Sequence, residues 1–193
     1  MFRSLRPWPA MFRALRSSQA PARPLRRARR HFSPQSLPLE QLEDRSVPSV
    51  ITLLVTSPAD SGDRTLRDAI MTADRGSAND SYVIKIVSPK TITLESELPH
   101  LIRDITITGS ASDKTTVRRD SAASSFRIFT VGAGETVNIF GLAIVGGNAG
   151  SGNGDGGGLD NSGTLTVSNS VFSGNSASNN GGGLANEDRK SVV

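Results

Sequence analysis

The stretch GTLTVSNSVFSGNSASNNGGGLAN (163–186) decides the fold, because it repeats features of the sequence that precedes it. Three pairs of segments correspond: GGGLDN (156–161) with GGGLAN (181–186), ETVNI (135–139) with GTLTV (163–167), and GGN (146–148) with SGN (173–175). The members of a pair lie 25 to 28 residues apart. A unit of this length, with alternating Thr and aliphatic residues followed by Asn, Ser and Gly, is typical of one coil of a solenoid.

Alternating polar and apolar residues within each unit indicate half-buried strands. In the segment 164–167 the apolar side chains fall on one face of an extended chain. Stacking such strands coil upon coil pairs their backbone groups and forms one apolar column. We therefore expect Leu165 and Val167 to align above Val137 and Ile139. The repeat length favours three short strands and their turns in each coil.

The same alternation predicts strands upstream of the repeats. These strands span residues 51–56, 82–87, 91–94, 104–109, 115–118, 127–131 and 136–145. The inward-facing side chains are predicted to be Ile105, Ile107, Val137, Ile139, Leu142 and Ile144. The pattern changes phase at Phe140 and Gly141, which indicates a bulge or a corner. Gly-, Asn- and Ser-rich segments at 146–158 and 173–183 are predicted to form the corners between strands.

One helix is predicted over residues 64–75. Leu66, Ala69, Ile70 and Ala73 form a single apolar stripe at helical spacing. Asp63 is the predicted N-cap and Gly76 the predicted stop signal. Because a solenoid must close its open end, this helix is predicted to cap the N-terminus of the fold. For Arg67 and Asp68, a solvated helix face is favoured over a catalytic role.

Charge is distributed unevenly along the chain. Residues 1–32 contain nine arginines and no acidic residue, while the rest of the chain carries 13 basic and 18 acidic residues. The basic segment is predicted to be a targeting sequence or a disordered tail. Its alternative role, as an arm that binds nucleic acid, is less favoured, and we predict no nucleic-acid partner. MFRALR, which starts at Met11, nearly copies MFRSLR at Met1, so Met11 is an alternative start.

Two further features concern export and redox chemistry. No segment approaches the roughly 18 apolar residues that a transmembrane helix needs, and no apolar core of an ordinary signal peptide follows the arginines. The chain has no cysteine, which excludes a disulfide framework, a thiolate metal site and a cysteine nucleophile.

Several motifs resemble those of bacterial surface proteins. FSGN (172–175) and the two GGGL segments resemble the repeats of polymorphic outer-membrane proteins. VTSPADSGDRTLRDAIMTAD (55–74) resembles the CSLREA segment, with Arg64 in place of Cys, Thr65 in place of Ser and Asp68 in place of Glu. LPLEQLEDRSVPS (37–49) resembles an LEDR motif of large exported proteins. The resemblance implies a right-handed parallel β-helix of the pectin-lyase type, of which this chain is an N-terminal fragment.

The predicted fold class is therefore all-β, a right-handed parallel β-helix with an N-terminal capping helix and a disordered Arg-rich leader. The predicted organisation is a leader at 1–36, an LEDR-type linker at 37–49, a cap at 50–81, β-helix coils at 82–187, and a tail at 188–193. The tail DRKSVV resembles the translation of a sequencing adapter, and we expect the natural protein to continue beyond it.

Candidate catalytic residues are sparse. His100 lacks a spaced partner and is interpreted as a turn residue rather than a general base. A charged cluster comprises Asp113, Lys114, Arg118, Arg119 and Asp120. It evokes a polysaccharide-lyase site, but it lies in and beside one loop, so a solvated loop is favoured. The outward positions of the clearest strands are Thr106, Thr108, Asn138, Thr164 and Thr166, which offer no charge for proton abstraction. We predict no catalytic residue.

The glycine-rich stretch contains two weak motifs. Gly152, Gly154 and Gly157 match GxGxxG, but no helix-forming sequence follows, so a dinucleotide site is rejected. Oxygen ligands for calcium are offered by Asn153, Asp155, Asp160 and Asn161. Their spacing departs from the calcium-binding nonapeptide repeat, so turn chemistry is favoured. We predict no cofactor and no metal.

The function predicted from the sequence is a non-catalytic, exported module at the cell surface, structural or adhesive, with surface polysaccharide or other surface proteins as partners. Its alternative is the N-terminal part of a polysaccharide lyase or hydrolase whose active site lies in further coils. The alternative predicts release of uronate from acidic polysaccharides. Fold alone does not separate the two, because this scaffold hosts enzymes and adhesins alike.

Overall fold

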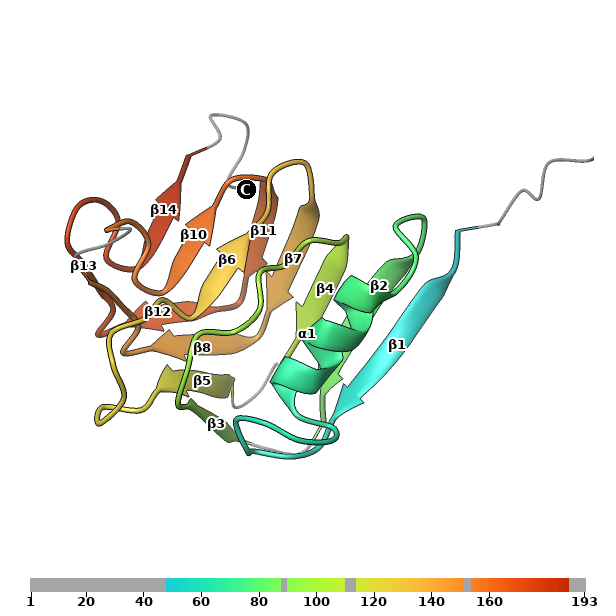
Figure 1. Ribbon diagram of the computed structural model, residues 1–193, viewed down its shortest axis with the longest axis horizontal. Coiled ribbons are helices and arrows are strands. Elements are labelled where there is room, and N and C mark those ends of the chain that lie inside the picture. Colours follow the sequence, from blue (N-terminus) through green and yellow to red (C-terminus); the bar gives the residue numbers. More distant parts are fainter. Residues whose placement is uncertain (1–47, 88–89, 110–113, 151–153, 188–193) are drawn as a thin grey trace, which may run out of the picture. The chain divides into compact units, whose positions relative to one another are not determined.

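Short parallel strands, stacked coil upon coil, make up the fold (Figure 1). The structure is a computed structural model that describes residues 48–87, 90–109, 114–150 and 154–187. All of these residues belong to one compact unit, Glu43–Val193. The predicted leader, nearly all of the LEDR-type linker and the tail at 188–193 lie outside the described residues.

The longest sheet, sheet A, contains one strand from each coil. Its strands are β1 (Val50–Val55), β2 (Ser81–Ile86), β4 (Ile105–Thr108), β7 (Thr136–Phe140) and β11 (Thr164–Ser168), in the spatial order β1-β2-β4-β7-β11. Every neighbouring pair is parallel. Consecutive strands of this sheet are separated in sequence by the rest of a coil, which is the connectivity of a solenoid.

Three further sheets complete the coils. Sheet B contains β3 (Thr91–Leu94), β5 (Thr115–Arg119), β8 (Leu142–Val145) and β12 (Val171–Ser173). Sheet C contains β6 (Phe129–Val131), β10 (Leu159–Asn161) and β14 (Leu184–Asn186), and sheet D contains β9 (Asn148–Ala149) and β13 (Ser176–Ala177). The chain is thus a parallel β-solenoid of about five turns. The prediction of three strands per coil was too low for the last two coils, because a short strand of sheet D forms within the predicted corners.

Register between coils confirms the predicted apolar column. Leu165 pairs with Val137 and Val167 pairs with Ile139. All six predicted inward-facing side chains are buried. The GGGL segments also align, since Leu159 pairs with Leu184. The GGN and SGN segments do not align asparagine to asparagine. Asn148 lies opposite Ser176, which follows the asparagine of SGN. The reason is that the paired residues of sheets A, B and D keep the same spacing in sequence between these two coils.

Gly141 forms the corner that the phase change predicted. Its φ of 70° lies in the left-handed region, where glycine meets no Cβ penalty. The predicted strand 136–145 therefore divides into β7 and β8, which belong to different sheets. The corner lets Ile139 and Leu142 both face the interior although they are not two residues apart.

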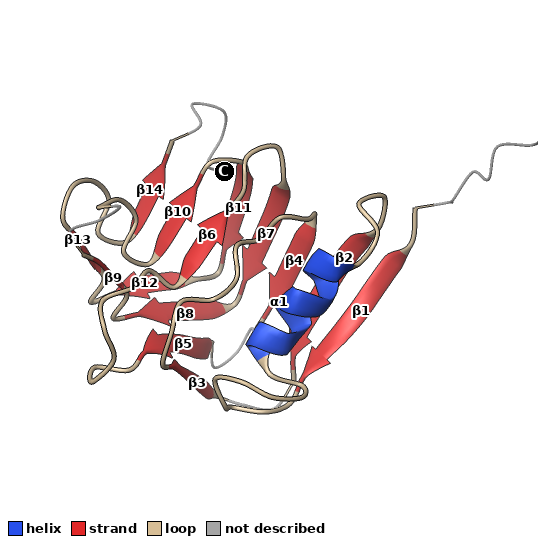
Figure 2. Ribbon diagram, viewed as in Figure 1, coloured by secondary structure: helices blue, strands red, loops and turns tan. Residues whose placement is uncertain are grey.

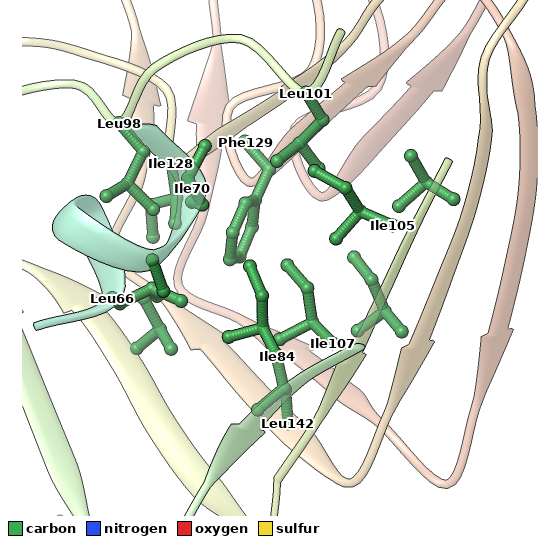
Figure 3. Close-up of a cluster of buried hydrophobic side chains, with 14 of the residues drawn as sticks. Leu66, Ile70, Ile84, Leu98, Leu101, Ile105, Ile107, Ile128, Phe129 and Leu142 are labelled. Atoms are coloured by element: carbon green, nitrogen blue, oxygen red, sulfur yellow. The ribbon is translucent and has the colours of Figure 1, made fainter. Parts of the chain in front are cut away.

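The single helix, α1 (Leu66–Arg75), packs onto β1 and β2 (Figure 2). Its buried residues are Leu66, Ala69, Ile70 and Ala73, which confirms the predicted stripe. Figure 3 shows Leu66 and Ile70 in one cluster with Ile84, Leu98 and Ile128. Sheets B, C and D begin only after α1 in the chain. At the N-terminal end of the solenoid, the apolar stripe of α1 therefore covers the part of the core that no strand of these sheets covers.

The helix begins later than predicted, and its N-cap is Thr65 rather than Asp63. Thr65 has an extended backbone, and its side chain accepts a hydrogen bond from the Asp68 N–H at 3.2 Å. Asp68 Oδ2 in turn accepts from the Arg64 N–H at 3.0 Å, which resembles a capping box. Arg64 has a φ of 57°, so the right-handed helix cannot extend back to Asp63. Gly76 ends the helix, as predicted, by donating its N–H to Ala73.

Candidate functional site

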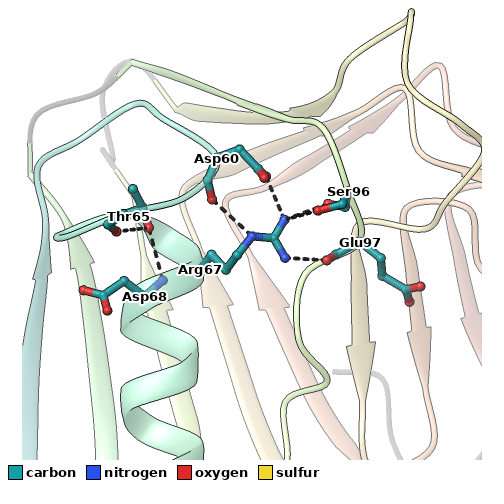
Figure 4. A network of polar contacts seen from close by, with 7 residues as sticks. Asp60, Thr65, Arg67, Asp68, Ser96 and Glu97 are labelled. Carbon is teal, nitrogen blue, oxygen red and sulfur yellow. Dashed lines mark hydrogen bonds and ion pairs between the residues drawn. The ribbon is translucent and has the colours of Figure 1, made fainter.

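Arg67 is a structural link rather than part of a solvated helix face, so that prediction was wrong (Figure 4). Its guanidinium donates to the carbonyl oxygen of Asp60 at 3.2 Å and pairs with Asp60 Oδ1 at 2.7 Å. On the other side it donates to the carbonyl oxygens of Ser96 at 2.9 Å and Glu97 at 2.6 Å, and to Ser96 Oγ at 3.0 Å. The side chain is only 15% exposed. Arg67 therefore joins the loop before α1 to the segment that follows β3.

The charged cluster that evoked a lyase site does not converge on one point. Asp113 lies outside the described residues. Arg118 is exposed and donates to Thr93 Oγ1 at 3.0 Å across sheet B. Asp120 accepts from the Ala122 N–H at 2.9 Å within a turn. Lys114 stands at the start of β5 with a φ of 38°, where it shapes the entry to the strand.

Arg119 donates hydrogen bonds to backbone carbonyl oxygens, in its own turn and in the next coil. It donates to the carbonyl oxygens of Gly146 at 2.9 Å, Asp120 at 2.9 Å and Ala123 at 2.8 Å. Its guanidinium carbon lies 6.0 Å from the centre of the Phe126 ring. These contacts, made by Nε and Nη1, hold the connection between β5 and β6 against the next coil.

His100 lies close enough to the carboxylate of Asp74 for its charge to act on it. The sequence around His100 gives no sign of this neighbour. Burial raises the pKa of Asp74, on α1, above its ordinary value of 3.8. A backbone hydrogen bond from Ile102 and the charges of Arg103 and His100 oppose this effect without cancelling it. Asp74 Oδ1 and Arg103 Nε are both buried and have no hydrogen-bond partner within the described ranges. The carboxylate of Asp74 is therefore held in an unfavourable environment.

This environment predicts how stability depends on pH. Because the pKa of Asp74 is higher in the folded state than in the unfolded state, its contribution to stability is greatest below its ordinary value of 3.8. That contribution declines as pH rises through the folded-state pKa. We expect Asp74→Asn to remove this decline, so the variant gains stability relative to the parent as pH rises above 3.8. Urea unfolding at a series of pH values checks this, with the exposed Asp63→Asn as control; parallel curves for Asp74→Asn and parent would contradict it.

Asp160 and Asn161, two of the oxygen donors for which turn chemistry was favoured over calcium binding, lie in strand β10 instead of a turn, which corrects the turn interpretation. Asp160 forms a buried ion pair with Arg127. Burial raises the pKa of Asp160, and Arg127 opposes this effect. Asp160 Oδ1 is buried without a hydrogen-bond partner in the described part of the chain. The sequence did not predict the ion pair of Arg127 and Asp160, because the two residues are 33 positions apart.

Asn161 is the start of an asparagine stack between coils. Its Nδ2 donates to Asn186 Oδ1 at 2.7 Å and to the Gly163 carbonyl at 2.9 Å, and its Oδ1 accepts from the Gly163 N–H at 3.2 Å. The repeated Asn of GGGLDN and GGGLAN was the sequence signal for this contact. Asp155 lies in a bend, and its Oδ1 accepts from the N–H of Asn180 in the following coil at 2.8 Å. Gly152 and Asn153 lie outside the described residues, whereas Gly154 and Gly157 pack closely against the following coil.

The outer face of sheet A presents side chains in register across the coils. One row runs Thr52, Val83, Thr106, Asn138, Thr166, and the next runs Leu54, Lys85, Thr108, Phe140, Ser168. Asn138 Nδ2 donates to Thr106 Oγ1 at 3.4 Å along the first row. In β4, β7 and β11 the outward side chains of these rows are uncharged, as predicted. An aromatic ring at Phe140 therefore lies beside hydroxyl and amide groups.

Within the described ranges, no three His, Cys, Asp or Glu side chains gather so that they could hold a metal ion. In the same residues, no helix has the length and apolar character to cross a membrane.

No protein-family model, curated protein or solved structure matches this chain.

Proposed function

We propose that this chain is a non-catalytic, structural or adhesive module of an exported cell-surface protein, and that it contacts carbohydrate through the outer face of sheet A. The observation that carries the proposal is the pair of rows in which Phe140 lies between Thr108 and Ser168 and next to Asn138. Neighbouring strands lie about 4.8 Å apart, and alternate residues along a strand about 7 Å apart. The face therefore offers a regular array of donors and acceptors.

The chemistry of these side chains suits a sugar better than a reacting substrate. Thr, Ser and Asn side chains donate and accept hydrogen bonds, as sugar hydroxyl groups do. The apolar face of an aromatic ring packs against the C–H groups of a pyranose. In β4, β7 and β11 these rows carry no group able to abstract a proton, which supports binding rather than cleavage.

We further propose that the chain is related to the CSLREA-type surface proteins with a right-handed, pectin-lyase-like β-helix. The support is that residues at the motif positions, three that match it (Leu66, Arg67 and Ala69) and Thr65 in place of Ser, each have a structural role. Thr65 caps α1, Leu66 and Ala69 enter the core, and Arg67 joins two loops. Export is proposed from the Arg-rich leader and from the resemblance of residues 37–49 to the LEDR motif of large exported proteins.

The test is binding of the chain to a panel of neutral and acidic polysaccharides, followed by calorimetry with the best ligand. The variant Asn138→Ala with Phe140→Ala removes one amide and the ring from the centre of the face. We expect its affinity to fall about tenfold. The matched control, Thr91→Ala with Thr116→Ala, changes paired residues of sheet B and is expected to bind as the parent does. Equal affinities for both variants, or release of unsaturated uronate, contradict the proposal.

A further inference from the structure

The two halves of α1 are attached to the solenoid in different ways. Leu66 and Ile70, in the first half, are fully buried and lie in the core cluster that Figure 3 shows. Arg67, from the same half, bonds to the loop before α1 and to the segment after β3 (Figure 4). In the last turn of the helix only Ala73 is buried. Because an alanine side chain buries little apolar area, the last turn is the weakly held end of the helix.

The carboxylate of Asp74 attaches this last turn to the segment 100–104. It accepts a hydrogen bond from the backbone N–H of Ile102. Its Oδ1 and the Nε of Arg103 are buried, and neither has a hydrogen-bond partner in the described part of the chain. An ionised carboxylate has two acceptor oxygens, and leaving one of them unfilled away from water is costly. The contact therefore suits the neutral form of Asp74 better than the charged form.

Charged and titratable groups face Asp74 from the neighbouring elements. His100 and Arg103, on the segment 100–104, attract its negative charge, and Glu135, in the turn before β7, repels it. β2 contributes Tyr82, whose hydroxyl donates to a backbone carbonyl oxygen in the turn after α1 at 3.2 Å. β1 carries no titratable side chain. Burial outweighs the attraction of the two cations and raises the pKa of Asp74, so the neutral form persists to a higher pH than in the unfolded chain.

Movement of the last turn brings an ionised Asp74 to water at little cost in packing. It takes only Ala73 out of the core and leaves the buried side chains of the first half of α1 in place. The contacts of Arg67 also stay intact, because they lie at the other end of the helix. Arg75, which follows Asp74 on α1, is already exposed. The last turn can therefore open while the rest of the helix remains docked.

We propose that the last turn of α1 is a proton-controlled latch, closed on the segment 100–104 while Asp74 is protonated and open once Asp74 is ionised. The cap of the solenoid is then held most tightly in acidic surroundings. Opening is local, because the first half of the helix and the strands of sheet A keep their contacts. A local opening differs in this respect from a change in the stability of the whole fold.

Hydrogen exchange of the full chain at a series of pH values tests the latch. Protection factors, corrected for the intrinsic pH dependence of exchange, are compared between the last turn of α1 and sheet A. For the amides of residues 73–76, protection is expected to fall at least about tenfold as pH rises above 3.8. The amides of Ile84 and Ile107 in sheet A are expected to keep theirs. Constant protection in the last turn, or an equal fall in sheet A, overturns the proposal.

Two variants assign the pH dependence to one carboxyl group. Asp74→Asn keeps a side-chain acceptor of similar shape but cannot ionise, so protection of residues 73–76 is expected to become independent of pH. Asp63→Asn removes an exposed carboxylate just before the helix and is expected to behave as the parent does. A pH dependence that persists in Asp74→Asn, or that disappears in both variants, refutes the latch.

Discussion

Gly158→Ala is expected to lower the free energy of unfolding by about 3 kcal/mol. A Cβ at this position would lie 2.5 Å from the Gly183 carbonyl oxygen and 2.9 Å from Asn175 Nδ2, both of which belong to the following coil. Backbone atoms of a stacked coil cannot move away without breaking the pairing of β10 with β14. Urea unfolding, followed by circular dichroism, measures the loss.

The second GGGL segment supplies the control variant for Gly158→Ala. Gly183 occupies the position of Gly158 in the second GGGL segment, but among the described residues its added Cβ would meet only the Phe172 side chain, with Cβ at 3.4 Å and Cγ at 3.8 Å. Gly183→Ala is therefore expected to change stability by no more than about 0.5 kcal/mol. The two variants make the same substitution at equivalent positions, but within residues 154–187 a further coil packs against Gly158 and none packs against Gly183. Equal losses of stability would mean that the coils are not stacked as described.

Arg67→Ala is expected to cost about 3 kcal/mol of stability, because it removes charge-assisted hydrogen bonds from a side chain that is only 15% exposed. The loop at Asp60 and the segment at Ser96 lose their common partner, and their carbonyl oxygens lose a charged donor. Arg67→Lys is expected to recover only part of the loss, because an ammonium group cannot reach both sides as the guanidinium fork does. Urea midpoints at constant slope measure both effects.

Arg118→Ala is the matched control for Arg67→Ala. Arg118 is exposed and has one hydrogen bond to a side chain, Thr93 Oγ1. Its loss is expected to change stability by no more than about 0.5 kcal/mol. If Arg67→Ala were as mild as this control, the link between the two loops would contribute little to the fold.

The candidate binding face was predictable, whereas the ion pairs and the buried carboxylates were not. Strict alternation placed Thr106, Asn138 and Thr166 outward, because successive side chains of a strand point to opposite faces. The environment of Asp74 depends on Arg103 and His100, which follow it after two strands. Nothing in the local pattern around Asp74 distinguishes it from a solvated helix residue.

The interpretation of Asp160 failed for a related reason. Leu-Asp-Asn after three glycines matches turn chemistry, and the sequence offered no sign that Arg127 would neutralise the carboxylate. Likewise, the N-cap was assigned to Asp63 because aspartate is a common cap, although Thr65 followed by Asp68 is the stronger capping pattern. The left-handed backbone at Arg64 then excludes Asp63 from the helix.

The sequence by itself determined that this chain stacks strands into a solenoid, which residues face the core, where Gly141 turns the chain, and which stripe of α1 is buried. These features depend on side-chain periodicity and on the backbone freedom of single residues, which are local properties. Only the tertiary structure decided the partners of Arg67 and Asp160 and the presence of the fourth sheet. Those features depend on which coils become neighbours and on the length of each connection between strands, so they arise only once the register between distant segments has formed.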